Sequence, residues 1–296
     1  MPRLTTEKSA GWPPRVGVIG SRANLRNLEL VRGLRRIGCA AALVDPLAAR
    51  TVLGDGDIAI TRLDVLPTLD GVEPGLDTLA ELELRGVRLL NRPEALLRAH
   101  DKLLTAGVLR RACIPHPVTV HLADPYAPLG LNPPLVVKPR FGSWGIDVYR
   151  CRTSSEARLR LHELRDTSWF RANGVLVQAL VRAEPRDVRL IVAGGAVVGA
   201  IERIATPGEW RTNVSTGASR RPILPTRSEQ ELAVASAEAL GLDLVGVDLL
   251  RGEEGDVVIE LNGAVDFDAL YSLDGRDIYG DICAALALGP VLSVAK

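Results

Sequence analysis

The sequence is poor in the residue types on which several classes of site depend. Its 296 residues include four cysteines and four histidines. The cysteines form no CxxC pair and the histidines form no HExxH-like spacing, so neither a disulfide framework nor a zinc site is indicated. No Ser/His/Asp or Cys/His arrangement suggests a nucleophile supplied by the protein itself. Chemistry based on these groups is therefore not expected.

An excess of charge is also absent. Lysine plus arginine and aspartate plus glutamate each number 36, so the formal net charge is zero and nothing favours a nucleic-acid binder. No apolar run approaches the ~20 residues that cross a membrane. Residues 1–14 lack the apolar segment of a signal peptide and are expected to form a flexible leader. We expect a cytoplasmic protein that binds neither nucleic acid nor membranes.

Lysine is the rarest cation of the chain. The basic residues are almost all arginine, and the only lysines are Lys8, Lys102, Lys138 and Lys296. The first and last of these lie near the ends of the chain. Because arginine is the default cation here, the two internal lysines are the basic residues whose presence most needs an explanation.

Alternating strand and helix patterns occupy residues 15–98. Short apolar segments at 15–20, 40–46, 57–62 and 87–91 are typical of buried strands, and helical spacing is seen at 24–37 and 78–85. Gly38 would end the first of these helices. This alternation predicts a parallel, Rossmann-like sheet with helices on its faces.

Two α+β units are predicted to follow. In residues 99–182 a helix at 101–111 precedes strands at 116–122 and 174–181 and a strand pair around residue 143. In residues 183–296 the pattern predicts a hairpin, a polar loop, a helix, a strand pair and a final helix, at 188–205, 206–222, 228–240, 244–262 and 277–288. The expected fold class is therefore α/β (α+β) with three domains, 15–98, 99–182 and 183–296.

The segment VVKPRFGSWGIDVYR, residues 136–150, places Lys138 just before a glycine loop. Strand-like residues lie on both sides, so the loop closes an antiparallel hairpin. It is neither a Walker A loop nor a Rossmann fingerprint, since both lead into a helix. Glycine backbone N–H groups can nevertheless approach phosphate oxygens closely, and Lys138 would reach the same phosphates. The alternative is an ordinary hairpin with a glycine turn.

Three oxygen-bearing side chains gather on the strand pair 244–250 and 256–262. Its odd positions are apolar and predict a core face, Val245, Val247, Leu249, Val257, Ile259 and Leu261. Its even positions place Asp248, Glu260 and Asn262 together on the other face with no basic residue between them. Two carboxylates and an amide oxygen suit a hard cation such as Mg²⁺. A solvated strand face is the alternative, and the metal site is favoured.

Cationic and amide side chains lie between these two features. Asp187 and Arg189 share one strand face, Arg203 lies on the return strand, and Arg211 and Asn213 are two apart in the loop. Guanidinium groups near a Mg²⁺ carboxylate pair fit the transfer of a phosphoryl group. For any one arginine of this arginine-rich chain, a surface role is the simpler interpretation.

Taken together, these motifs resemble the ATP-grasp superfamily, in particular the RimK/LysX-like carboxylate–amine ligases. The similar segments follow in order over about 190 residues: RLLNRPEALLRAHDK, VVKPRFGSWGIDV, GVLVQALV, AIERIATPGEWRTNVSTGA and VGVDLL with VVIELNG. Both internal lysines fall on matching positions. The chain departs from the family pattern at Ala179, where a glutamate is usual, and in the loop that follows Asn213. The Gly-Ser-Trp-Gly loop is closest to the LysX-like branch.

The resemblance implies a role for each matching residue. Those implied to bind ATP are Lys102, Lys138, Gly142, Ser143, Trp144, Gly145, Gln178, Ala179, Leu180, Val181, Asp187, Arg211 and Asn213. Those implied to hold Mg²⁺ or Mn²⁺ are Asp248, Glu260 and Asn262. Arg203 and Arg211 would be catalytic, and Arg189 and Arg203 would contact the substrate.

The implied reaction is ATP-dependent amide bond formation. A substrate carboxylate attacks the γ-phosphate to give an acyl phosphate and ADP, and an amine displaces phosphate while the glycine hairpin closes as a lid. The amine would be L-glutamate or another amino acid, and the carboxylate would belong to a peptide, a carrier protein or a small molecule. A homodimer or tetramer is expected from the resemblance. The alternatives are an ATP-grasp small-molecule kinase and a nucleotide-binding regulatory module without turnover.

Overall fold

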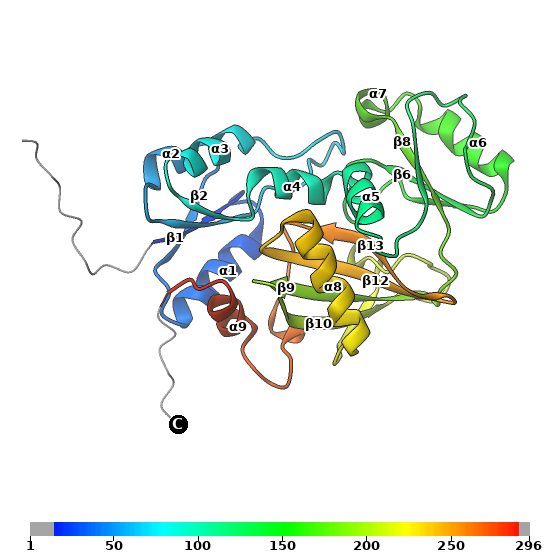
Figure 1. Ribbon diagram of the computed structural model, residues 1–296. Helices are drawn as coiled ribbons and strands as arrows, with labels where there is room; N and C mark the ends of the chain where they lie inside the picture. The colour runs from blue at the N-terminus through cyan, green and yellow to red at the C-terminus, as the bar shows by residue number, and fades with distance from the viewer. Residues whose placement is uncertain (1–14, 290–296) are drawn as a thin grey trace, which may run out of the picture.

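The computed structural model describes residues 15–289, so the predicted leader at 1–14 and the last seven residues lie outside the described part. Within it the chain forms three β-sheets with helices packed against them. In the view of Figure 1 the first sheet lies at the left, the second at the upper right, and the third between and below them. Among these residues, no helix is both long and apolar enough to cross a membrane.

The first sheet is entirely parallel, with strand order β2-β1-β3-β4. Its elements are β1 (Val16–Ile19), α1 (Leu25–Arg36), β2 (Ala41–Val44), α2 (Ala49–Val52), β3 (Ile58–Thr61), α3 (Leu76–Leu84) and β4 (Arg88–Leu90). Helix α1 begins at Asn24, whose side chain accepts a hydrogen bond from the backbone N–H of Arg26, as an N-cap does. The predicted parallel sheet is confirmed, and the short α2 was not predicted.

The second sheet is antiparallel, with strand order β5-β8-β6-β7. The elements of this part of the chain are α4 (Pro93–His100), α5 (Lys102–Arg111), β5 (Thr119–Leu122), β6 (Leu135–Pro139), β7 (Tyr149–Cys151), α6 (Ser154–Leu164), α7 (Ser168–Asn173) and β8 (Val175–Ala179). Leu135, Leu161 and Val177 are fully buried in its core. The sheet carries Lys138 on a central strand, β6, whose neighbours are β7 and β8.

The third sheet has strand order β11-β10-β9-β12-β13 and is also antiparallel. Its elements are β9 (Arg186–Ala193), β10 (Ala196–Ile204), η1 (Val214–Thr216), β11 (Ser219–Pro222), α8 (Arg227–Leu240), β12 (Leu244–Gly252), β13 (Gly255–Asn262), η2 (Ala269–Tyr271) and α9 (Ile278–Ala285). The predicted hairpin across Gly194 and Gly195 is confirmed, and both glycines have positive φ. Strand β11 falls in the segment predicted to be a loop.

Helices α1, α4 and α5 pack against the third sheet and fix its position relative to the rest of the chain. The core around α1 is continuous with the third sheet, because Leu34 and Ile60 belong to the same buried cluster as Ile191 and Ile282. Helices α4 and α5 contact β13, and both also contact α8. Helix α5 therefore brings Lys102, its first residue, close to the carboxylates of the third sheet.

Candidate active site

A cavity of about 880 Å³ collects most of the residues predicted from the sequence. The predicted residues that line it are Lys102, Lys138, Gly142, Ser143, Trp144, Gly145, Gln178, Ala179, Leu180, Val181, Asp187, Arg203, Arg211, Asn213, Asp248 and Glu260. They come from the second sheet, from the third sheet and from the loops between them. Arg189 and Asn262 do not line the cavity, although both lie on strands that border it.

Lys138 is a buried cation to which no carboxylate between residues 15 and 289 is bonded. Its side chain lies on β6, with only 6% of the residue exposed, and Nζ donates to Oε1 of Gln178 at 2.8 Å. Gln178 is held in turn by a hydrogen bond from Nε2 to Oγ1 of Thr119. Burial lowers the pKa of Lys138 to about 8, helped by the positive charge of Lys102 and opposed by Glu260. An ammonium in this environment gains from a negatively charged ligand.

If Lys138 holds the phosphates of a bound nucleotide, as the sequence predicts, its lowered pKa makes nucleotide binding depend on pH. The neutral amine attracts phosphate less than the ammonium does, so the dissociation constant for ADP, measured by calorimetry in EDTA, should increase from about pH 8 upwards, by as much as about tenfold per pH unit. Lys138→Ala should bind ADP more weakly at pH 7 and lack this increase. Lys138→Arg should bind with an affinity that changes little over the same range. If the ADP affinity of Lys138→Arg fell with pH as that of wild type does, the titrating group would be a residue other than Lys138.

Lys102 and Glu260 form an ion pair at the inner end of the cavity. Lys102 Nζ lies 2.8 Å from Oε1 of Glu260 and donates to the carbonyl oxygen of Gly142 at 2.6 Å. The helix that carries this lysine is fixed by Asp101, which caps α5 and binds the Arg140 guanidinium through both carboxylate oxygens. Lys102 thereby connects the start of the glycine loop to the acidic strand pair.

Asp248 and Glu260 share one face of the strand pair, as predicted, and are register partners, but the prediction that no basic residue lies among the acids is wrong. Both oxygens of Asp248 accept hydrogen bonds from Arg189, at 2.6 and 2.7 Å, and one also accepts from Arg203 at 2.8 Å. The reason is that β12 has a second neighbour, β9, which places Arg189 opposite Asp248. Burial alone would raise the pKa of Asp248, but the two guanidinium groups outweigh it and lower the pKa to about 2.

The predicted core face of β13 is also wrong at two positions. The β12–β13 register shifts between Asp248 and Leu249, so that Leu249 pairs with Val258 and Ile259 is the extra residue of a bulge. Val258 is buried in the core, whereas Val257 is half-buried and Ile259 lines the cavity. A bulge reverses the alternation of faces beyond it, which a strictly alternating pattern cannot anticipate.

Asn262, the last residue of β13, is paired with Gly246 on β12. Its Nδ2 is buried and has no hydrogen-bond partner among the described residues. A buried N–H without a partner costs free energy, so Nδ2 would be satisfied by an acceptor oxygen of a ligand, whereas the amide oxygen is the atom that could bind a cation. No group of three or more histidine, cysteine, aspartate or glutamate residues between positions 15 and 289 is arranged to hold a metal ion by itself.

The glycine loop closes an antiparallel hairpin, as predicted, with Val137 paired to Tyr149. The loop is longer than expected, because residues 144–147 form turns and β7 begins only at Tyr149. Its tip contacts the opposite loop, where Arg211 donates to the carbonyl of Gly145 at 3.0 Å and Ser215 Oγ donates to that of Trp144 at 2.8 Å. A Cβ on Gly145, whose φ is 71°, would lie 2.6 Å from Oδ1 of Asn213. The two loops therefore meet across the cavity.

Several residues of the cavity were missed in the sequence. Apolar side chains form one wall, contributed by Pro117, Val136, Val148, Leu250 and Ile259. Thr212 donates from Oγ1 to Asp187 at 2.6 Å, and Asp187 also binds Arg203 through both carboxylate oxygens. The signal for Thr212 was its position between Arg211 and Asn213, and for Leu250 and Ile259 it was their strands, which also carry the acids.

Comparison with known proteins gives the same family. A model of the RimK-like ATP-grasp domain matches residues 99–286. A probable alpha-L-glutamate ligase from Serratia proteamaculans is 34% identical over 85% of this chain and 88% of its own length. One from Citrobacter koseri is 32% identical over 90% of this chain and 91% of its own length.

Solved structures show the same fold. The D-cycloserine synthetase DcsG aligns over 92% of this chain and 99% of its own, with a TM-score of 0.69 and 20% identity. The ATP-grasp ligase PsnB, in a complex with a variant of its minimal precursor, Mg and ADP, aligns over 94% of this chain and 99% of its own, with a TM-score of 0.65 and 21% identity. The chain therefore belongs to the RimK-like ATP-grasp family and is an ATP-dependent ligase that forms carbon–nitrogen bonds.

Proposed function

We propose that this enzyme uses ATP and Mg²⁺ to join the amino group of L-glutamate to a carboxylate through an acyl phosphate. The single observation that carries this proposal is the convergence, in one cavity, of Lys102, Lys138 and Arg203 with Asp248 and Glu260. Cations and carboxylates so arranged suit the transfer of a phosphoryl group. Glutamate is proposed as the amine because several relatives, from different bacteria, carry the name alpha-L-glutamate ligase.

We place ATP along the length of the cavity. The adenine would lie against the apolar wall and the backbone of residues 178–181, where Ala179 and Leu180 line the cavity in place of the residues usual in the family. The phosphates would lie at Lys138, Lys102 and the N–H groups of the glycine loop. Asn213 and Asp187 line the cavity on its opposite side. Buried ammonium groups and exposed backbone N–H groups are both suited to phosphate oxygens.

The oxygen side chains of the strand pair fit a magnesium ion. Mg²⁺ is commonly held by one or two carboxylates together with phosphate oxygens and water, so it needs no cluster of three acids. Glu260, Asp248 and the amide oxygen of Asn262, which share one face of the strand pair, are the proposed ligands. When bound, the ion would neutralise phosphate charge. The negative charges of these carboxylates are balanced by Lys102, which pairs with Glu260, and by Arg189 and Arg203, which pair with Asp248.

The chain's own residues position and neutralise the reacting groups. Arg203 lines the cavity between Asp187 and Asp248, and its fixed guanidinium would stabilise the charge that develops on the transferred phosphoryl group. Arg211 extends from Glu209 to the carbonyl of Gly145, so it would serve both the phosphates and the closed position of the lid. Arg189, behind Asp248, is proposed to act on the substrate side. The lid would exclude water from the acyl phosphate.

The carboxylate partner is proposed to be a peptide, a carrier protein or a small molecule. PsnB was solved with its precursor peptide and AMPPNP, and peptide binding is thus compatible with the fold. A homodimer or tetramer and a cytoplasmic location stay predictions from the sequence.

The test is to identify the products. Purified protein would be mixed with Mg-ATP, L-glutamate and a pool of carboxylates and peptides, followed by nucleotide analysis and mass spectrometry. ADP together with a glutamate-containing amide is the expected result. ADP with a phosphorylated compound would support a kinase instead, and AMP would contradict the acyl phosphate route. Omitting L-glutamate serves as the matched control, because an amide formed without it would overturn the choice of amine.

A further inference from the structure

Two buried polar side chains of the first sheet reach across to the strands that carry the proposed metal ligands. Arg62 and Asn91 directly follow β3 and β4, at the carboxyl edge of the parallel sheet. Thr61, the last residue of β3, donates from Oγ1 to the carbonyl oxygen of Asn91 at 2.6 Å. Open α/β sheets typically form ligand sites at this edge. Here the edge instead holds residues 263–266, which follow Asn262.

Asn91 uses every hydrogen-bonding position of its side chain. The residue has no exposed surface. Its Oδ1 accepts from the backbone N–H groups of Asp243, at 2.7 Å, and Leu244, at 2.9 Å. Its Nδ2 donates to the carbonyl oxygens of Leu244, at 2.8 Å, and Gly263, at 3.3 Å. A carboxamide has two acceptor and two donor positions, so Asn91 is fully satisfied and joins the start of β12 to the residue after β13.

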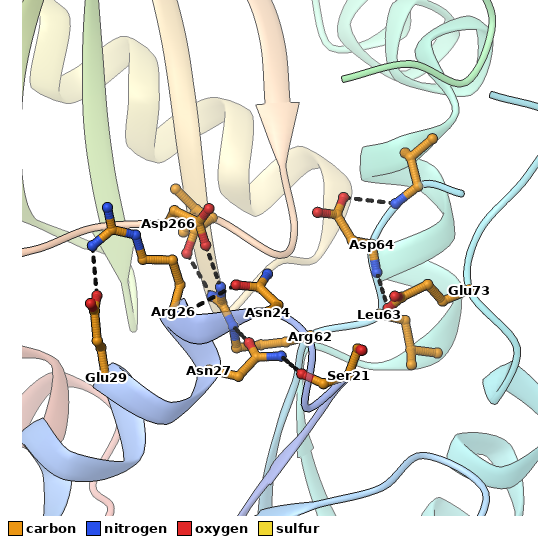
Figure 2. A network of polar contacts seen from close by, with 12 residues as sticks. Ser21, Asn24, Arg26, Asn27, Glu29, Arg62, Leu63, Asp64, Glu73 and Asp266 are labelled. Atoms are coloured by element: carbon orange, nitrogen blue, oxygen red, sulfur yellow. Dashed lines mark hydrogen bonds and ion pairs between the residues drawn. The ribbon is translucent and has the colours of Figure 1, made fainter. Parts of the chain in front are cut away.

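Arg62 holds the same segment two residues further along (Figure 2). The residue is 3% exposed, and its guanidinium donates in three directions. Nε donates to Oδ1 of Asn27 at 2.5 Å, Nη1 to the carbonyl of Val265 at 2.5 Å, and Nη2 to Oδ1 of Asp266 at 2.9 Å. Asn27 is itself fixed by a hydrogen bond to the carbonyl of Ser21. The segment is thereby tied to α1 and to the loop after β1.

The segment has little freedom to move independently of Asn262. A Cβ on Gly246, the register partner of Asn262, would lie 2.4 Å from Cγ2 of Val265. A Cβ on Gly263 would lie 2.6 Å from Cδ1 of Leu96 on α4. Close packing of this kind transmits a displacement instead of absorbing it. The position of residues 263–266 therefore sets the position of the end of β13.

We propose that Arg62 and Asn91 are positioning residues for the divalent cation. They hold residues 263–266 so that the Asn262 amide and the Glu260 carboxylate lie where the ion needs them. The first sheet would thus take part in the ligase reaction although neither residue lines the cavity. This inference rests on the proposed metal assignment. Residues that orient metal ligands typically change metal affinity by about 10–100-fold when they are replaced.

The experiment measures Mn²⁺ binding in the presence of saturating ADP, by calorimetry and by the electron paramagnetic resonance of free Mn²⁺. The variants are Arg62→Lys, which keeps the charge but not the three-way geometry, and Asn91→Ser, which removes the carboxamide. Each should raise the Mn²⁺ dissociation constant about tenfold or more, while the affinity for ADP in EDTA stays within about twofold of wild type, because Lys138 and the apolar wall are untouched. If Asn91→Ser does not fold, Arg62→Lys decides the question.

The matched control is Leu53→Ala. Leu53 is buried in the first unit, against Gly17. Its replacement by alanine should lower the melting temperature without altering the affinity for Mn²⁺. Folded Arg62→Lys and Asn91→Ser proteins that are less stable but bind Mn²⁺ like wild type would overturn the proposal. Glu260→Gln distinguishes failure of the proposed metal site from failure of the proposed positioning role. If Mn²⁺ binding persists in that variant, the metal assignment itself is wrong and the positioning role falls with it.

Discussion

Replacing Glu260 with glutamine is expected to lower the turnover number by about 10³-fold or more, because the variant loses a carboxylate that we propose as a ligand of Mg²⁺. Glu260 faces Asp248 across the β12–β13 register and is the ion-pair partner of Lys102. Glutamine has the same shape and its side-chain site is partly open to solvent, so the fold should be kept. Steady-state ADP release would measure the loss, and circular dichroism with thermal melting would check the fold.

The control for this experiment is Glu254→Gln. Glu254 lies on the exposed turn between β12 and β13 and does not line the cavity. Removing its charge changes the net charge of the protein as Glu260→Gln does, but should leave turnover close to wild type. If Glu260→Gln retained more than about a third of wild-type turnover, against the loss expected for a residue that holds the catalytic metal, Glu260 would not be a metal ligand.

Replacing Asp248 with alanine is expected to cost about 3–5 kcal/mol of the free energy of unfolding, because breaking a buried ion pair leaves uncompensated charge behind. Asp248 is 3% exposed and is bonded to both Arg189 and Arg203. Without it, the buried Arg189 loses its bonded carboxylate, and the buried Arg203 keeps its bond to Asp187. Urea denaturation monitored by fluorescence would give the change, and ADP release should be lost as well.

The lowered pKa of Asp248 predicts that the folded protein loses stability in acid. The pKa of Asp248 is lowered to about 2 in the folded protein from an ordinary value of 3.8. A carboxylate with a depressed folded-state pKa stabilises the protein above the unfolded-state pKa, and this contribution is lost as the pH falls from about 4 to about 2. Asp248→Ala should therefore show a smaller loss of stability over that range than wild type.

Two comparisons keep this prediction specific. Arg227 and Glu231 form an exposed pair on α8, and Arg227→Ala should leave the free energy of unfolding close to that of wild type. In the double variant Asp248→Ala/Arg189→Met the stranded charge of Arg189 is removed, so part of the stability should return. If Asp248→Ala were no more destabilising than Arg227→Ala, the buried network would not stabilise the fold.

Much of the candidate site could be predicted from short-range patterns. The glycine hairpin, the strand that carries Lys138 and the shared strand face of Asp248 and Glu260 follow from apolar alternation and turn residues that lie close together in the chain. The scarcity of lysine directed attention to Lys102 and Lys138, and both line the cavity. The parallel first sheet was predictable for the same reason, since each strand and the helix after it carry their own periodicity.

The errors came from two features that the local pattern of apolar residues does not record. The alternation in β13 predicted a core position for Ile259, but the bulge after Asp248 turns this residue into the cavity. The two-strand pattern suggested bare acids, but β9 lies along the other side of β12 and supplies Arg189. Neither the extra residue of a bulge nor the second neighbour of a strand leaves a mark in the local pattern.

The sequence by itself determined which residues make up the candidate site: two lysines, two facing carboxylates, a glycine loop and the arginines between them. These are properties of residue type and local spacing, and local spacing sets strands, turns and the faces of side chains. Only the tertiary structure decided which charged side chains form ion pairs with each other. It also placed Arg62 and Asn91 of the first sheet where they donate hydrogen bonds to the segment that follows β13. Those contacts join residues more than 150 positions apart, and they form because a polar group that is buried without a partner costs free energy.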